Sequence, residues 1–302
     1  MRSSSLDMEA TRSGLIAVPV TINGTPQNMI VSPNAFMGDV SQKLVDTLDL
    51  KVLALKDANS TNPAFRYGPI YFGNGEHAKG VTRIASVVVG MENIAYTEFL
   101  INPYRPDEDG KIAGALGYDV WQHFDLDFDF ANGKLNLFSP DHCPGKVVYW
   151  AGSYTDADTR SAGGGGIGVT MSLDGHDVDS TLDVASPVTT MTLTAARTAF
   201  GIDENSPGVE KLTQDGGTIY RTHFKALTLS GITVNNPEVY LIPDAVAETA
   251  RKDLQEDKMN GYEGRDSISS PHLVVGLNVL RHLHLYVAYK EHKIYVTAAD
   301  AH

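Results

Sequence analysis

The chain has 302 residues, enough for two domains that each bury a core without disulfide or metal staples. Its formal net charge of -13 argues against a nucleic-acid partner, because phosphate binding needs a basic patch. The single cysteine, Cys143, excludes an intrachain disulfide and fits a reducing compartment without establishing one.

The sequence predicts neither a membrane span nor an N-terminal signal peptide. No run of about 18 apolar residues occurs, so no membrane span is expected. Residues 1–13 are polar and lack the apolar segment of a signal peptide, and they predict a flexible N-terminal tail. The compartment stays unassigned, and an exported mature form is compatible with this sequence.

The chain contains an internal repeat. Val20–Gly24 matches Met171–Gly175, and in the same frame Met29–Ser32 faces Ser180–Asp183. Each copy then continues into a short helix-like stretch that begins with a good N-cap residue and closes on apolar residues. These two stretches are Ser41–Leu48 and Thr192–Phe200.

The later parts of the two copies match as well. Gly117–Leu126 faces Gly276–Leu285, and each is followed by two alternating strands around a tight turn. Ser86–Gly90 faces Ala226–Ser230 as a further strand pair. Three blocks in the same order indicate a duplication rather than a chance match of hairpins.

The repeat sets the expected domain boundaries. Residues 14–138 form the first lobe and residues 169–302 the second. Between them, residues 139–168 predict a linker, because Gly163–Gly166 is too flexible for a strand. This glycine run lacks the Lys-Ser/Thr ending of a phosphate-binding loop. Strands dominate, helices are short and turns are rich in Gly, Pro and Asn, so the predicted fold class is all-β.

The order of strand, Asn-Gly or Asp-Gly turn, second strand, short motif and helix resembles one half of a retropepsin or pepsin. Gly114–Trp121 and Val274–Leu280 resemble the hydrophobic-hydrophobic-Gly segment of the same aspartyl proteases. The similarity runs from about Gly14 to Ala298 and is greatest to bacterial double-domain retropepsin-like proteins. It implies a bilobal fold of two retropepsin-like β-barrel lobes. An extended peptide or protein segment would lie in the cleft between them, with no cofactor or metal, in a monomer.

In such proteases each half supplies an Asp-Thr/Ser-Gly triplet to the cleft. Two nearby carboxylates share one proton, so one acts as base towards water and the other as acid towards the developing oxyanion. Here the second half has Asp183 followed by Val184 and Ala185, and the first has Ser32 followed by Pro33 and Asn34. Val184 and Pro33 carry no hydroxyl, so the usual cross-lobe hydrogen bonds cannot form.

The substitution of Ser32 leaves Asp183 without a like-charged partner. Unless it is deeply buried, Asp183 is expected to ionise with a pKa near ~4. Loss of the acid partner is expected to slow proteolysis by a factor of roughly 10²–10⁴. Asp39 is a candidate replacement, although its place before the helix favours an N-cap role.

Two hairpins resemble the flaps that cover bound peptide in these proteases. Glycines at a tip and aromatic residues on the stems suit a mobile lid. An ordinary exposed hairpin with core-facing tyrosines explains the pattern equally well. The flap residues expected from the resemblance are Tyr67, Tyr71, Gly73, Gly75, Gly216, Gly217 and Tyr220.

Aspartates recur along one strand of the first copy. Asp125, Asp127 and Asp129 alternate and share a face with His123. A metal cluster is one interpretation, but a solvated outer face of an antiparallel sheet is favoured.

Two further patterns predict no site. His282 and His284 in the second copy form a His-x-His pair that lacks a visible third zinc ligand, so no metal site is predicted. Ser32 lies in no Gly-x-Ser-x-Gly motif, and a Ser32–Asp183 pair without histidine lacks a base strong enough to activate the hydroxyl.

These observations favour an aspartic-protease-like protein that is catalytically impaired and binds a peptide or protein segment. The alternative is an active aspartic-type endopeptidase with a non-standard site centred on Asp183. A third hypothesis is an exported scaffold whose cleft binds nothing.

Overall fold

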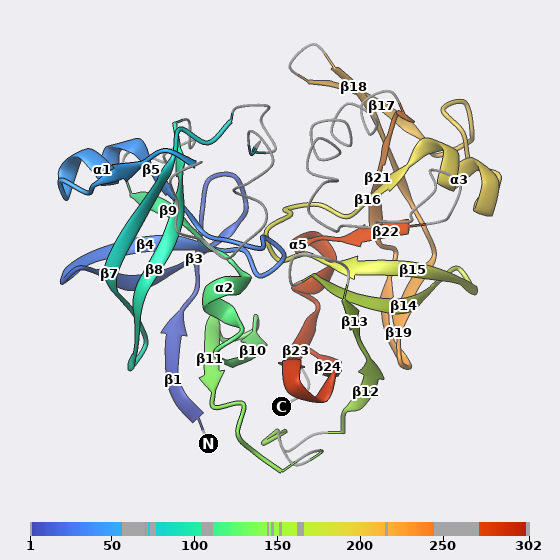
Figure 1. Ribbon diagram of the computed structural model, residues 1–302. Helices are drawn as coiled ribbons and strands as arrows, with labels where there is room; N and C mark the ends of the chain where they lie inside the picture. The colour runs from blue at the N-terminus through green and yellow to red at the C-terminus, as the bar shows by residue number, and fades with distance from the viewer. Residues whose placement is uncertain are drawn as a thin grey trace.

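A computed structural model gives the fold of the chain. It describes residues 2–55, 70, 72, 77–103, 111–143, 145, 148–150, 153–161, 166–214, 217–244 and 272–299. Two β-rich halves lie side by side above a third sheet (Figure 1), which confirms the predicted all-β, two-lobed fold class.

The sheet of the first half closes on itself, because β3 pairs with β4 on one side and with β7 on the other. Apolar residues alternate along β3, and the Asn23-Gly24 turn takes positive φ at both residues, as a tight hairpin requires. In sheet order the strands are β2 (Glu9–Ala10), β3 (Ile16–Ile22), β4 (Thr25–Val31), β9 (Ile112–Leu116), β5 (Asp39–Ser41), β8 (Glu92–Asn102), β7 (Val81–Val89) and β6 (Val52–Leu53).

The sheet of the second half repeats this plan. The Asp174-Gly175 turn has the same pair of positive φ angles and joins β14 to β15. In sheet order the strands are β17 (Glu210–Gln214), β18 (Gly217–His223), β21 (Glu238–Ile242), β16 (Thr190–Thr192), β22 (His272–Val275), β15 (His176–Leu182), β14 (Ile167–Leu173), β19 (Ala226–Leu229) and β20 (Ile232–Asn235). A short strand, β13 (Arg160–Ser161), pairs with β14.

The third sheet joins the halves. Its strands in order are β1 (Arg2–Asp7), β11 (Lys134–Phe138), β10 (Asp125–Asp129), β23 (Leu283–Ala288), β24 (Lys293–Ala298) and β12 (Thr155–Asp158). The central pairing is between β10 and β23, with Leu126 opposite Val287. Each half therefore contributes three strands, and the two sets meet at this pairing. The arrangement of the sheet thus matches the duplication in the sequence.

Short helices follow the strands at matching places. They are α1 (Gln42–Thr47), α2 (Tyr118–Trp121), α3 (Leu193–Phe200), α5 (Leu277–Leu280) and the 3-10 turn η4 (Tyr289–Glu291). Ser41 Oγ accepts from the Leu44 amide at 3.2 Å, and Thr192 Oγ1 accepts from the Ala195 amide at 3.2 Å. The predicted N-caps Ser41 and Thr192 are confirmed.

The N-cap role predicted for Asp39 is wrong. This residue lies in β5, two positions before the cap, and its side chain is buried. Asn102 Nδ2 donates to Asp39 Oδ1 over 3.4 Å, so the carboxylate is held by a neighbouring strand and not by the helix.

The flexible tail predicted for residues 1–13 is also wrong. Residues Arg2–Asp7 form β1, which pairs with β11 from Phe138 to Lys134. Leu6 is buried in the main core, and Glu9–Ala10 pair with β3 as β2. The segment is polar in composition, but it is ordered by its backbone pairing and by the buried side chain of Leu6.

The predicted linker at residues 139–168 contains ordered strands. Thr155–Asp158 pair with β24, and Arg160–Ser161 pair with β14. In the frame of the duplication β12 and β13 correspond to β1 and β2, with Asp158 opposite Asp7. The repeat therefore begins before Gly14, and residues 163–165 of the glycine run lie outside the described residues.

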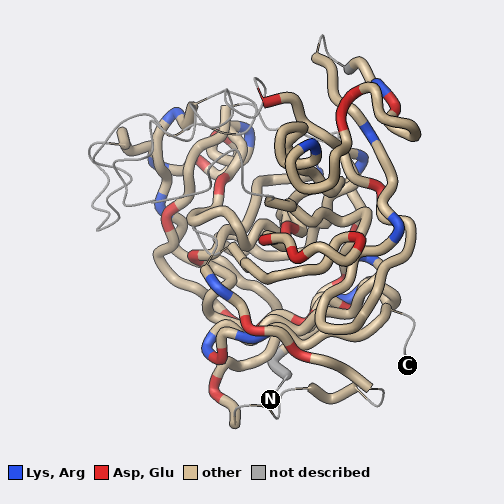
Figure 2. Tube along the Cα trace, turned by 90° about the vertical axis from the view of Figure 1, so that its right-hand side faces the viewer, with Lys and Arg blue, Asp and Glu red and all other residues tan. Residues whose placement is uncertain are grey.

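One large hydrophobic core runs through both halves. It includes Trp121 and Phe128 from the first half and Leu173 and Val296 from the second. Among the described residues no helix is long and apolar enough to cross a membrane. Basic and acidic positions are interspersed along the described trace (Figure 2).

Candidate functional site

Ser32 and Asp183 occupy the same backbone position in the two halves. Each follows the strand that ends its hairpin, β4 or β15. The Ser32 amide donates to Leu116 O at 3.0 Å, and the Asp183 amide donates to Val275 O at 2.9 Å. The turns continue alike, because the third residue after each donates back to its carbonyl oxygen, at 3.1 Å to Ser32 and 3.2 Å to Asp183. The two halves therefore have the same backbone conformation at this position and differ in the side chain that it carries.

The two turns meet through Asn34. Its side-chain nitrogen donates to the carbonyl oxygen of Leu182, the residue before Asp183, at 2.9 Å. Pro33 and Val184 are buried, and Val184 belongs to the main core. An amide–carbonyl hydrogen bond thus links two loops that lack the hydroxyls of the expected triplets.

Burial raises the pKa of Asp183. The cost of removing the charged carboxylate from water outweighs the hydrogen bond from the Ala185 amide to Oδ1, 2.9 Å long, which lowers the pKa. The value near ~4 expected for an exposed Asp183 was conditional on solvent access, and desolvation moves this carboxyl towards the neutral form.

A glycine behind each turn permits close packing. An added methyl group at Gly117 would lie 2.4 Å from the carbonyl carbon of Met37, and one at Gly276 would lie 2.2 Å from Val188 O. The next residues tie the turns down in parallel ways, because Tyr118 donates to Ala35 O at 2.7 Å and Leu277 donates to Ser186 O at 2.8 Å. These segments pack closely behind the turns that carry Ser32 and Asp183 and are hydrogen-bonded to them.

Asp119 is a second carboxyl in this region, and sequence reasoning did not single it out. It accepts the Gly38 amide at 3.0 Å, and desolvation raises its pKa to about 7. The matching residue in the second half is Asn278, which accepts from Thr189 Oγ1 at 2.7 Å and donates to Glu238 O at 2.9 Å. Setting Asp119 against the neutral amide of Asn278 in the repeat alignment was the signal that could have identified it.

Most of the expected flap lies outside the described residues. Tyr67, Tyr71, Gly73, Gly75 and Gly216 belong to that part of the chain. Gly217 begins β18 opposite Gln214. Tyr220 lies further along β18, opposite Lys211 and Leu241, and its partly buried ring packs against the main core.

The favoured interpretation of Asp125, Asp127 and Asp129 as a solvated face is wrong. All three are buried, with Asp125 and Asp127 at 0% exposure. Two described residues that follow β11 contact them, because His142 bonds to Asp125 and Tyr149 donates to Asp127. The aromatic residues Tyr149 and Trp150 pack against Phe138 and His284.

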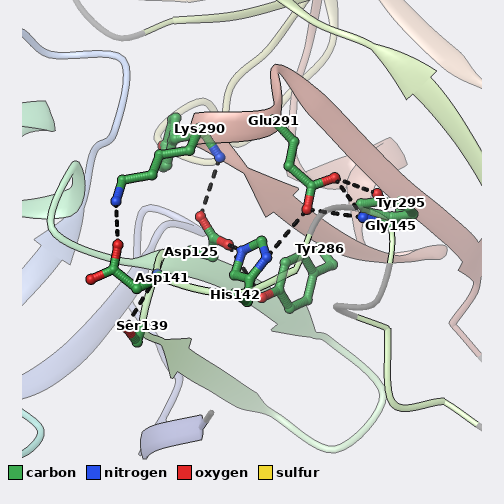
Figure 3. Close-up of polar contacts among 10 residues, drawn as sticks. Asp125, Ser139, Asp141, His142, Gly145, Tyr286, Lys290, Glu291 and Tyr295 are labelled. Atoms are coloured by element: carbon green, nitrogen blue, oxygen red, sulfur yellow. Dashed lines mark hydrogen bonds and ion pairs between the residues drawn. The ribbon is translucent and has the colours of Figure 1, made fainter.

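Asp125 is the centre of one polar network (Figure 3). His142 Nε2 bonds to Asp125 Oδ2, while His142 Nδ1 lies 3.3 Å from Glu291 Oε1. Glu291 also accepts from Tyr295 OH at 2.6 Å. Burial raises the pKa of Asp125, and the His142 contacts oppose that rise.

Asp127 is the centre of a second network. Its Oδ1 lies 2.9 Å from His284 Nε2, and its Oδ2 accepts from Asn136 and Tyr149, each at 2.8 Å. Asp129 instead holds its own hairpin turn, because it accepts from both nitrogens of Asn132.

These polar residues do not form a metal cluster in the described part of the chain. No group of three or more His, Cys, Asp or Glu side chains there has an arrangement suited to a metal ion. His123 lies just before β10 and His282 just before β23, and both are exposed. The aspartates pair with buried histidines, with tyrosine hydroxyl groups and with asparagine amides.

Comparison with known proteins supports the fold. No family model matches the chain, and no curated protein matches it. The crystal structure of edgp is similar with a TM-score of 0.55 at 8% identity, covering 98% of this chain and 94% of that one. Likeness at this identity shows the fold alone, which is aspartic-protease-like. It does not extend to the bacterial double-domain retropepsin group.

Proposed function

We propose that this chain is an aspartic-protease-like protein that binds an extended peptide between its halves and has lost efficient proteolysis. The observation that carries the proposal is the presence of Ser32 at the backbone position that Asp183 occupies in the other half. Aspartic-protease chemistry needs two carboxyl groups at one site, one neutral and one ionised. A serine supplies neither a base nor an acid of suitable pKa.

The neighbours of Ser32 and Asp183 support loss of activity rather than a changed mechanism. Pro33 is buried, Val184 packs in the main core, and the Asn34 amide is used in the bond to Leu182. With one carboxyl group missing, we expect proteolysis slowed by roughly 10²–10⁴-fold relative to an intact pair. The preserved backbone of the turns supports continued peptide binding, because main-chain contacts do not depend on the lost carboxylate.

A working endopeptidase centred on Asp183 is the second candidate. Its support is the raised pKa of Asp183, which makes one carboxyl group available in neutral form over a wider pH range. Such an enzyme would still need a base, for which the matched position offers only the Ser32 hydroxyl. The impaired protein is therefore favoured.

Cleavage assays separate the two candidates. The protein is incubated with a mixed peptide library from about pH 3 to 8, and products are identified by mass spectrometry. We expect no cleavage above that of Asp183→Asn, a neutral variant of nearly the same shape. Cleavage by the wild type that disappears in Asp183→Asn would overturn the impaired-protein proposal.

Rebuilding the site gives a second test. We expect cleavage to appear when Ser32→Asp is combined with Pro33→Thr and Asn34→Gly. The same triple variant with Ser32→Asn in place of Ser32→Asp is the matched control, and it should remain inactive. Activity in both would show that a second carboxyl group is not what the natural chain lacks.

Peptide binding is tested independently of cleavage. A fluorescent extended peptide pool is titrated with the protein, and bound label is displaced by unlabelled peptides. We expect saturable binding that weakens in Ser32→Arg, which places a long cationic side chain at a partly exposed position of the turn that Asn34 links to the second half. Absence of saturable binding in the folded wild type would favour the scaffold whose cleft binds nothing.

A further inference from the structure

Strand β8 has an edge that the described strands cover only in part. Over residues 92–97 it pairs with β7 on one side, whereas β5 covers the other side only from Leu100 to Asn102. No described strand pairs with the remaining edge, and Ala95 and Tyr96 are both exposed. An unpaired strand edge presents backbone donors and acceptors to which an extended segment can add.

A cavity of about 550 Å³ lies along this edge. It is lined by Glu92–Ala95 of β8, by His123 and Phe124, and by Ser139–Asp141. The volume falls within the range of sites that enclose small ligands or a few residues of a peptide. The edge thus borders a concave surface rather than a flat one.

The ionisable groups of this cavity suit a cationic side chain. Among the described residues its lining contains the carboxylates of Glu92 and Asp141 and no Lys or Arg. Asp141 is paired with Lys290 at 2.6 Å, whereas Glu92 makes no ion pair with a described residue. A partner segment that carries Lys or Arg would give Glu92 an opposite charge.

Tyr96 stands out on the same edge. Its φ is 56°, a left-handed conformation that is unfavourable for a bulky residue. The repeat alignment that sets Gly90 opposite Ser230 sets Tyr96 opposite Asn236, whose φ is 53°. The bend therefore belongs to the fold, and the second half makes it with a residue type that tolerates it.

The tyrosine side chain packs little against the described residues, so little packing offsets this strain. Its exposure is 74%, and Met91 at the tip of the same hairpin is also 74% exposed. The hairpin end is fixed beside β1, since Gly90 packs against Ser4. A strained aromatic residue kept at the surface points to contact with another molecule.

We propose that the edge of β8 is a docking site for an extended, Lys- or Arg-containing segment of a partner protein. The segment adds as a strand along residues 92–95, Tyr96 packs on it, and Glu92 pairs with its cationic side chain. The net charge of -13 disfavours a second copy of the chain as occupant. This site is separate from Ser32 and Asp183, so it does not depend on the proposed function.

Designed probes test the proposal. Labelled peptides of alternating Val and Thr carry one central Lys, or Glu at the same place, and binding to the full chain is followed by fluorescence anisotropy. We expect the Lys peptide to bind more tightly than the Glu peptide. Tyr96→Asn, which installs the residue of the other half, should weaken the Lys peptide by about tenfold while leaving the melting temperature unchanged or higher.

Two charge variants sharpen the test. Glu92→Lys should reverse the preference between the Lys and Glu peptides. Asp177→Lys, at an exposed position of β15, makes the same change in net charge elsewhere and should leave the preference intact. An unchanged preference in Glu92→Lys, or undiminished binding in folded Tyr96→Asn, would overturn the docking site.

The proposed peptide-binding region between the halves is distinguished by its own variant. Lys-peptide binding that survives Ser32→Arg but not Tyr96→Asn supports the β8 edge. Loss in folded Ser32→Arg with retention in Tyr96→Asn assigns the peptide to the region between the halves and refutes the edge site. A dimer in light scattering that Tyr96→Asn abolishes would show that the occupant is a second copy, which also overturns the proposal.

Discussion

The side chain of Asn34 crosses from the first half to the second and donates to the carbonyl oxygen of Leu182 at 2.9 Å. This bond connects the two turns at residues that an ordinary triplet would not use. It makes Asn34 a structural link as well as a departure from the expected glycine. Restoring Gly at position 34 would therefore remove a contact between the halves.

We predict that Asn34→Ala lowers the free energy of unfolding by about 1 kcal/mol, the usual net value of one hydrogen bond. A larger loss is not expected, because Asn34 Oδ1 is already buried without a partner among the described residues. Urea unfolding measures the change. Asn28→Ala is the control, since its amide is exposed and the bond that it donates to Glu9 is 3.4 Å long. Equal effects of the two variants would contradict the role of the cross-half bond.

The buried Leu6 provides a test of the ordered N-terminal strand. Leu6 is 7% exposed in β1, so Leu6→Ala should lower the free energy of unfolding by about 2–3 kcal/mol through lost burial and a residual cavity. Ser5 is exposed on the same strand, and Ser5→Ala should change stability by less than about 0.5 kcal/mol. Thermal unfolding of both variants measures these changes in stability. A negligible effect of Leu6→Ala would mean that β1 does not contribute to the folded core.

The fold follows from local sequence patterns that occur in both copies of the repeat. Asn23-Gly24 and Asp174-Gly175 mark the same turn, and Ser41 and Thr192 cap the same helix. Such signals act within a few residues, so a single sequence is enough to read them. Agreement between the two copies then supported assignments of turns and helices that one copy alone would leave ambiguous.

The misplaced predictions concern contacts between distant residues. Polar composition suggested that residues 1–13 are flexible, because the strand β11 that pairs with Arg2–Asp7 is far along the chain. Alternating aspartates suggested a wet face, because nothing in β10 reveals that His142 and Tyr149 will cover it. The raised pKa of Asp119 likewise depends on desolvation that only the packed structure defines.

The buried pair of His284 and Asp127 should be important for stability. His284→Ala leaves Asp127 fully buried without one of its partners, so we predict a loss of about 3 kcal/mol in the free energy of unfolding. His282→Ala, two residues earlier and exposed, should have an effect below about 0.5 kcal/mol. Chemical unfolding of both variants at one pH provides the measurement. Comparable stabilities would show that Tyr149 and Asn136 alone satisfy Asp127.

Asp119 makes stability depend on pH in a direction that can be worked out. Desolvation raises its pKa from the ordinary value of 3.8 to about 7 in the folded chain, so the folded state binds more protons than the unfolded state between these values. Its contribution to stability is therefore fully present below about pH 4 and is lost as the pH rises through about 7. Asp119→Asn copies Asn278 of the other half, keeps an acceptor for the Gly38 amide and cannot ionise.

We therefore predict that Asp119→Asn matches the wild type near pH 4 and exceeds it in stability near pH 8, by at most about 4 kcal/mol. Melting temperatures across this range, taken as differences between the two proteins, remove the parallel effects of Asp125 and Asp183, whose pKa values are also raised. Asp177→Asn, on the exposed face of β15, is the control for losing one negative charge and should give a nearly flat difference. A flat difference for Asp119→Asn as well would mean that its carboxyl group titrates alike in the folded and unfolded chains.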